Sequence, residues 1–282
     1  MRYVFWGTPE FAVIILRGLI DGGYIPSAVV TNPDKPVGRK HIITPPPIKQ
    51  YVDEYCLRTG VVIPILQSEK IHDIAEQLRA FIPDIFIVAA YGKLIPPSIL
   101  DIPAKGSINV HPSLLPRYRG PTPIQTSLLN GDKKSGVSVM LLDKQMDHGP
   151  ILMQREAPIE KQNYLELSKE FAEMGAQLLL EAIPKWIEGK IQPISQNDNE
   201  ATFTRIYTRE DSFLDLTSSI EMLDRQIRAL NPEPGTYVIK NGKRIKILKA
   251  HIAHDVLVLD TIQHEGKKAM ICGKSLETFL SQ

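Results

Sequence analysis

Three polar side chains in two segments of the chain have the types and spacing for proton-transfer chemistry. Residues 108–125 carry Asn109 and His111, and residues 135–152 carry Asp147 before Gly149-Pro150. Alternate residues of a strand share a face, so Asn109 and His111 are expected on one side of a strand. A carboxylate near an imidazole favours its charged form and fixes its orientation, which makes Asp147 the expected partner.

Each of these residues also has an ordinary structural interpretation. A lone histidine at a strand end is more often structural than catalytic, although an adjacent amide and the nearby Arg117 and Arg119 favour a site. A carboxylate on a loop between strands can be a turn residue, and we expect this of Asp143. The residue types alone leave both interpretations open.

Short apolar runs that alternate with amphipathic stretches must position these side chains. Residues 2–7, 27–32, 84–92 and 106–111 read as strands, and residues 9–21, 69–80 and 164–189 as helices. This alternation predicts an α/β fold with a doubly wound, mainly parallel sheet. Pro112 ends the strand directly after His111, so His111 is expected at the carboxyl end of that strand, where such sheets bind ligands.

The composition and periodicity of the sequence change after residue 189. Residues 190–205 are polar, rich in turn formers and without period, so we predict a linker between a domain of residues 1–189 and one of residues 206–282. The second domain has a helical segment at residues 218–230 and then short β-like runs. Asn241-Gly242 between two such runs predicts a hairpin.

Composition narrows the class of protein. With 33 Lys+Arg against 32 Asp+Glu the net charge is +1, so any nucleic-acid partner must be met by a local basic patch. The two cysteines, Cys56 and Cys272, indicate neither a disulfide framework nor a zinc site and fit a reducing compartment. Apolar runs are of strand length and the N-terminus lacks a secretory pattern, so a soluble cytoplasmic protein is expected.

Several motifs together resemble the folate-dependent formyltransferases. They are residues 5–12, 31–40, 88–96, 108–120 and 131–152, and in the second domain residues 227–237 and 263–270. The Asn-x-His-x-Ser-Leu-Leu-Pro core with its downstream Asp is specific, and Gly266-Lys-Lys-Ala-Met270 is typical of the branch that acts on tRNA. The resemblance implies a Rossmann-like catalytic domain followed by a small β-barrel of oligonucleotide-binding type.

The resemblance also implies an activity and its residues. The activity is transfer of the formyl group of 10-formyltetrahydrofolate to the α-amine of methionine on charged initiator tRNA, as in translation initiation. Catalysis is carried over to Asn109, His111 and Asp147, with the amide and a protonated imidazole stabilising a developing oxyanion and the carboxylate accepting a proton. The implied folate-binding residues are Ser113, Leu114, Leu115, Pro116, Val88, Ala90, Tyr91 and Gly92. The implied tRNA-binding residues are Arg39, Lys40, Lys243, Arg244 and Lys246. Without the resemblance, these residues would be interpreted as ordinary solvent-exposed surface.

The chain departs from the family pattern at a few positions. Pro112 stands where the tRNA branch commonly has Gly, Tyr118 replaces its usual Trp, and the run Ala250–His254 leads almost directly into the next apolar run. About two strands' worth of chain is therefore missing, and we expect a shortened, incomplete barrel. We expect no metal, no membrane association and a monomer.

Two competing functions remain. One is N-formyl transfer to an amino-sugar nucleotide or other small amine with the same folate donor; Arg39 and residues 266–270 favour tRNA over it. The other is a folate or tRNA binder without catalysis, which the intact set of Asn109, His111 and Asp147 disfavours. A nicotinamide enzyme is disfavoured because Gly7-Thr8-Pro9 follows the first strand where a G-x-G-x-x-G would stand.

Overall fold

The computed structural model describes residues 1–38 and 41–281, which form two compact units. Unit 1 comprises Met1–Arg119, Gly136–Ala157 and Ser168–Thr202, and unit 2 comprises Gly120–Ser135, Pro158–Leu167 and Phe203–Gln282. The polar residues 190–202 therefore cluster with unit 1, whereas two short segments that precede residue 189 cluster with unit 2. The predicted domain boundaries at residues 189 and 205 stay a prediction.

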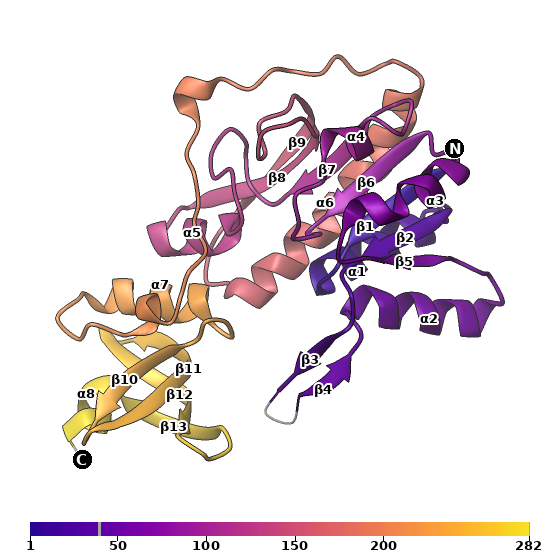
Figure 1. Ribbon diagram of the computed structural model, residues 1–282. Helices are drawn as coiled ribbons and strands as arrows, with labels where there is room; N and C mark the ends of the chain where they lie inside the picture. Colours follow the sequence, from indigo (N-terminus) through magenta and orange to yellow (C-terminus); the bar gives the residue numbers. More distant parts are fainter. Residues whose placement is uncertain (39–40, 282) are drawn as a thin grey trace. The chain divides into compact units, whose positions relative to one another are not determined.

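A seven-stranded sheet forms the centre of unit 1 (Figure 1). Its order is β5 (Ile65–Gln67), β2 (Ala28–Thr31), β1 (Tyr3–Gly7), β6 (Ile85–Ala89), β7 (Ser107–His111), β8 (Lys134–Leu141) and β9 (Ile151–Pro158). The first five of these run parallel, and β8 returns antiparallel to β7. This confirms the doubly wound, mainly parallel sheet and the Rossmann-like fold.

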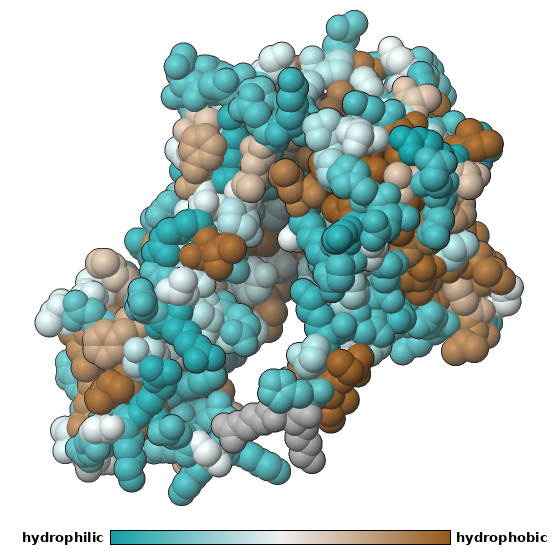
Figure 2. Space-filling model, viewed as in Figure 1, coloured by the Kyte–Doolittle hydropathy of each residue, from teal (hydrophilic) through white to brown (hydrophobic). Residues whose placement is uncertain are grey.

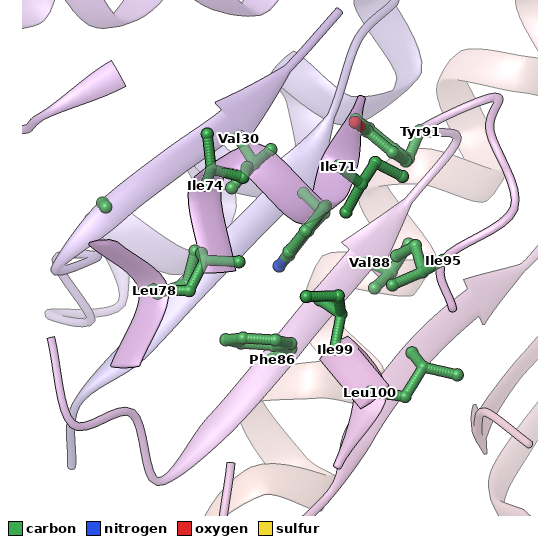
Figure 3. Close-up of a cluster of buried hydrophobic side chains, with 13 residues drawn as sticks. Val30, Ile71, Ile74, Leu78, Phe86, Val88, Tyr91, Ile95, Ile99 and Leu100 are labelled. Atoms are coloured by element: carbon green, nitrogen blue, oxygen red, sulfur yellow. The ribbon is translucent and has the colours of Figure 1, made fainter. Parts of the chain in front are cut away.

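Helices cover both faces of this sheet. Its parallel strands carry apolar side chains on both sides, and both sides must therefore be shielded from water. On one face, Trp6 packs 5.4 Å from Phe86 and 5.1 Å from Tyr91, measured between ring centroids. The short helices η1 (Ile71–Ile74), α3 (Ala75–Ala80) and α4 (Pro97–Leu100) close over this cluster (Figure 3). Among the described residues, no helix combines the length and apolar character needed to cross a membrane.

On the other face α1 (Glu10–Asp21) and α6 (Tyr164–Ile187) pack closely through glycines. A Cβ at Gly18 would lie 2.6 Å from the Cβ of Ala176, and one at Gly175 would lie 2.6 Å from Cγ1 of Val110 on β7. Both distances are shorter than any ordinary contact between carbon atoms. The missing side chain at Gly175 therefore lets α6 lie directly against the strand that carries Asn109 and His111.

Unit 2 is built on an open four-stranded antiparallel sheet. Its strands, in order, are β10 (Thr236–Lys240), β11 (Lys243–Ala253), β12 (Val256–His264) and β13 (Met270–Ser275). Buried Val238, Ile245 and Leu259 pack with α7 (Ile220–Leu230) and α8 (Leu276–Ser281). Asn241 and Gly242, both with positive φ, join β10 to β11, which confirms the predicted hairpin. The helix α5 (Pro123–Asn130) and the turn η3 (Glu210–Ser212) also belong to unit 2, whereas the turn η2 (Asp198–Glu200) belongs to unit 1.

The proline-rich stretch after β2 is more ordered than its composition indicates. Its prolines and basic residues are typical of a surface loop, but β3 (Lys35–Val37) and β4 (Ile42–Thr44) pair antiparallel and are followed by α2 (Pro47–Thr59). Its apolar side chains Val37, Ile42 and Ile43 are 57%, 62% and 61% exposed. Figure 2 shows hydrophobic surface on this segment of the chain. Pro36 lies within β3, and Pro45 directly follows β4. Strands this short and this rich in proline do not show the alternation of polar and apolar residues by which a strand is recognised.

The close approach of α6 to β7 gives a first prediction. Gly175→Val adds side-chain atoms against Val110, so we expect overpacking to lower the free energy of unfolding by about 1–3 kcal/mol. For a chain of this size that corresponds to roughly 2–4 °C in Tm per kcal/mol. Glu173→Val, on the exposed side of the same helix, is the control and should leave Tm nearly unchanged in a thermal melt. Equal Tm values for the two variants would contradict this packing.

Candidate active site

The strand β7 and the loop between β8 and β9 bring the three predicted catalytic side chains together. Asn109 and His111 project from β7 on one side, as expected from the period of a strand. Asp147 lies on the loop, with its Oδ1 3.6 Å from Nδ1 of His111 and 3.5 Å from Nδ2 of Asn109. The side chains of His111 and Asp147 are only 5% and 13% exposed. The amide of Asn109 and the imidazole of His111 therefore meet at one oxygen, Oδ1 of the Asp147 carboxylate.

His111 is oriented by a backbone carbonyl. Its Nε2 lies 2.8 Å from the carbonyl oxygen of Tyr118, which can only accept, so Nε2 carries the proton of this hydrogen bond. Tyr118 itself has φ 62°, in the left-handed region, and its N–H donates to Oγ1 of Thr202 at 2.8 Å. The ring atom that remains for a substrate is Nδ1, on the side of Asp147.

Asp147 owes its place to the backbone of its loop. It has φ 49°, and a Cβ at Gly149 would lie 2.0 Å from the carbonyl oxygen of Leu141. Only glycine allows that close approach, which sets the return of the chain into β9. The side-chain amide of Gln196 donates to the carbonyl oxygens of Asp147 at 2.9 Å and Gly149 at 2.7 Å.

Asp143, a second carboxylate on the β8–β9 loop, forms hydrogen bonds with other groups than those that Asp147 faces. Its Oδ1 accepts from the backbone N–H of Gln145 at 2.8 Å, which is the turn role expected from the sequence. Its Oδ2 lies 2.6 Å from Nδ1 of His148, and this hydrogen bond raises the pKa of the His148 imidazole. His148 is a residue that the sequence analysis did not single out.

The predicted folate loop, Ser113, Leu114, Leu115 and Pro116, is fixed by β8 and β9. Oγ of Ser138 donates to the Ser113 carbonyl at 2.6 Å and accepts from the Leu115 N–H at 3.1 Å. Gln154 donates to the Leu115 carbonyl at 2.9 Å, and the Leu115 side chain packs with Met140 and Ile151. The loop is thus held through its backbone and one apolar anchor.

The other predicted folate residues lie at the end of β6 and directly after it. Val88 and Tyr91 are 6% and 3% exposed and point into the core shown in Figure 3. Burial raises the pKa of the Tyr91 phenol to about 12, so its ring stays neutral. Ala90 and Gly92, with φ of 47° and 81°, are exposed. Only their backbone and small side chains face outward, so this segment can offer a ligand mainly peptide groups.

The predicted tRNA-binding residues fall in two places. Arg39 and Lys40 lie outside the described residues. Lys243, Arg244 and Lys246 are exposed on β11, and the guanidinium carbon of Arg244 lies 4.0 Å from the ring centroid of Tyr237.

Some residues around the site carry no recognisable sequence signal. Tyr118 acts through its carbonyl, and any residue type has one. Gln196 lies 49 positions from Asp147 in a polar segment that reads as a linker. Tyr237 does carry a signal in the sequence, since an aromatic residue beside a basic strand is a known nucleic-acid-binding pattern.

Comparisons with known proteins bear on both parts of the chain. Residues 1–183 match the formyl transferase family, and residues 207–257 match the formyl transferase C-terminal domain. The second match ends beside the short turn of His254 and Asp255 that joins β11 directly to β12.

Curated relatives align over most of the chain. The methionyl-tRNA formyltransferase of Halalkalibacterium halodurans is 44% identical over 250 residues, covering 88% of this chain and 77% of that protein. The methionyl-tRNA formyltransferase of Bacillus subtilis is 43% identical over 249 residues, covering 87% and 77%.

Solved structures share the fold at low identity. HypX from Aquifex aeolicus, in complex with tetrahydrofolic acid, has a TM-score of 0.67 at 14% identity and covers 97% of this chain and 46% of that one. A sugar N-formyltransferase from a Shewanella species has a TM-score of 0.66 at 18% identity, covering 90% and 99%. The family match over most of the length, together with the relatives above 40% identity, shows that the chain belongs to the formyl transferase family, among the methionyl-tRNA formyltransferases.

Proposed function

We propose that this protein transfers the formyl group of 10-formyltetrahydrofolate to the α-amine of methionine on initiator tRNA. The observation that carries the proposal is the approach of Asn109, His111 and Asp147 to one another at the end of β7. The names of relatives at 43% and 44% identity support the substrate. The proposed catalytic, folate-binding and tRNA-binding residues are those carried over from the family.

The geometry suits attack of an amine on a formyl carbonyl. Negative charge develops on the carbonyl oxygen, and hydrogen-bond donors aimed at that oxygen are usually the largest contribution to catalysis. Asn109 Nδ2 and Nδ1 of a protonated His111 are the donors on the Asp147 side of the site, since His111 Nε2 is engaged with Tyr118. The Asp147 carboxylate, near both groups, can accept the proton that the amine loses.

The folate donor fits what the loop after β7 and the segment after β6 present. A pterin has donors and acceptors along a flat edge, which peptide groups can match, and faces that need apolar walls. Ala90 and Gly92 expose backbone at the carboxyl end of β6, and Leu115 brings apolar surface from the fixed loop. The donor supplies the formyl group; these residues would hold and orient it.

In unit 2 the outer face of the four-stranded sheet supports a nucleic-acid partner. Ile245 and Ile247 point into the core, so the alternate residues Arg244 and Lys246 point to solvent. Tyr237 lies opposite Lys246 and packs 5.7 Å from the ring of Phe213. Cationic groups next to aromatic rings on a sheet are suited to phosphates and unstacked bases.

The β3–β4 hairpin is the proposed contact for the acceptor end of tRNA. Val37, Ile42 and Ile43 leave apolar surface exposed on it, and exposed apolar patches mark interaction sites. Lys35 is exposed on the same hairpin and can approach a phosphate, whereas Lys49 is held by Asp34 at 2.9 Å.

Replacing the side chain of either His111 or Asp147 should slow turnover. We expect His111→Ala and Asp147→Asn each to lower kcat by roughly 10²–10³, because each change removes stabilisation of the developing charge. The double variant should lose little more than the single ones, since the two act as a unit. Formylation of methionyl-initiator tRNA is measured at saturating substrates.

His72→Ala is the matched control, because His72 is an exposed histidine on η1. A His111→Ala protein with near-normal turnover would refute the assigned role. The same assay with an amino-sugar nucleotide as acceptor tests the substrate: product on the sugar and none on tRNA would replace the tRNA function by the sugar function.

Charge removal on β11 should weaken tRNA binding in a salt-dependent way. The triple variant Lys243→Ala, Arg244→Ala, Lys246→Ala loses up to three phosphate contacts, each worth roughly 0.7–0.9 in the slope of log K against log salt. Titrations of tRNA at several salt concentrations measure that slope.

The control lowers the net charge equally on α6 with Lys169→Ala, Lys185→Ala and Lys190→Ala. These lysines are exposed on or beside the long helix of unit 1. Equal slopes for the two triple variants would show that net charge, and not this sheet face, governs the salt dependence.

A further inference from the structure

The position of Asp147 depends on the backbone of the β8–β9 loop as well as on the groups that its carboxylate meets. Asp147 adopts a left-handed conformation with φ 49°, and its Oδ1 lies 3.5 Å from Nδ2 of Asn109 and 3.6 Å from Nδ1 of His111. Contacts that fix this backbone therefore also fix the carboxylate relative to His111.

The side chain of Gln196 binds this backbone twice. Both protons of its amide nitrogen are used, one on the carbonyl of Asp147 at 2.9 Å and one on the carbonyl of Gly149 at 2.7 Å. Its own segment is anchored to β9, where Ile194 and Ile151 exchange two backbone hydrogen bonds of 2.9 Å and 2.8 Å. A pair of bonds from one planar amide fixes the orientation of the loop as well as its distance.

The other end of the amide connects to the His111 side of the site. Oε1 of Gln196 accepts from Nε of Arg119 at 2.9 Å, and Arg119 is 4% exposed. Arg119 directly follows Tyr118, whose carbonyl orients His111. A second bond from Arg119, to Asp198 at 2.8 Å, holds the guanidinium in place. One chain of hydrogen bonds thus joins the backbones that place His111 and Asp147.

We propose that Gln196 is a positioning residue for the formyl transfer, which sets Asp147 relative to His111 without touching the substrate. This inference rests on the proposed function for its kinetic meaning, and on the contacts above for its structural meaning. Gln196 keeps both hydrogen-bonding halves occupied: the nitrogen holds the Asp147 loop, and the oxygen holds Arg119.

The test uses Gln196→Glu. Glutamate keeps the length of the side chain and an acceptor for Arg119, but it loses both donors and places a carboxylate against two carbonyl oxygens. We expect kcat to fall by roughly 10- to 100-fold, since a misplacement of about 1 Å can cost that much, with KM for the folate donor and for tRNA nearly unchanged. Gln196→Met, uncharged and of similar length, should show the same split if the glutamate variant folds poorly.

Gln154→Glu is the matched control. Gln154 also donates from one amide to two acceptors, the Leu115 carbonyl at 2.9 Å and Oγ of Ser138 at 2.8 Å, but these hold the predicted folate loop. The same chemical change there should raise KM for the folate donor by roughly tenfold and leave kcat largely intact. Opposite kinetic signatures for two equivalent substitutions cannot come from a general loss of stability.

A crystal structure of the Gln196→Glu protein supplies a readout that does not depend on activity. We expect the Asp147 carboxylate to move away from His111, while it stays in place in Gln154→Glu. Normal kcat in both Gln196 variants, or an unmoved Asp147, would overturn the inference. Wild-type protein that formylates neither acceptor would refute the proposed function, whereas the displacement of Asp147 would still decide the structural role of Gln196.

Discussion

The hydrogen bond from His111 to the carbonyl of Tyr118 decides which side of the imidazole is left for chemistry. It uses Nε2, so Nδ1 is turned toward Asp147 and Asn109. For this bond to form, the chain after β7 must fold back within a few residues, and Tyr118 must take a left-handed conformation. The chain that makes this turn includes Ser113 to Pro116, the residues proposed to bind the folate, which lie between His111 and Tyr118.

Much of this site follows from local pattern. The period of a strand placed Asn109 and His111 on one face, and the buried return of β8 beside β7 brought Asp147 to them. What the sequence could not predict are contacts through peptide carbonyls, because every residue carries one. The Tyr118 carbonyl and the two carbonyls bound by Gln196 are of this kind. The β3–β4 hairpin was missed for another reason: its prolines hide the alternation by which short strands are recognised.

The four-stranded sheet of unit 2 combines a closed core with a basic surface. His254 and Asp255 form a tight turn from β11 to β12, where the family resemblance predicts further chain. The core of unit 2 is nevertheless closed by α7 and α8 against Ile245, Ile247 and Leu259. Because side chains alternate along β11, burying the isoleucines necessarily presents Arg244 and Lys246 to solvent. A near-neutral chain thereby keeps a basic, aromatic face in the proposed place for tRNA.

A neutral amide is physically well suited to hold the Asp147 loop. A lysine or arginine in the place of Gln196 could also donate to the two carbonyls, but its charge would attract the nearby carboxylate and compete with His111 for it. A carboxylate there would repel both carbonyls and Asp147. Glutamine donates twice and accepts once, so it can fix the position of Asp147 without adding a charge of its own beside the carboxylate. On its oxygen side, Gln196 accepts from Arg119, which also donates to Asp198.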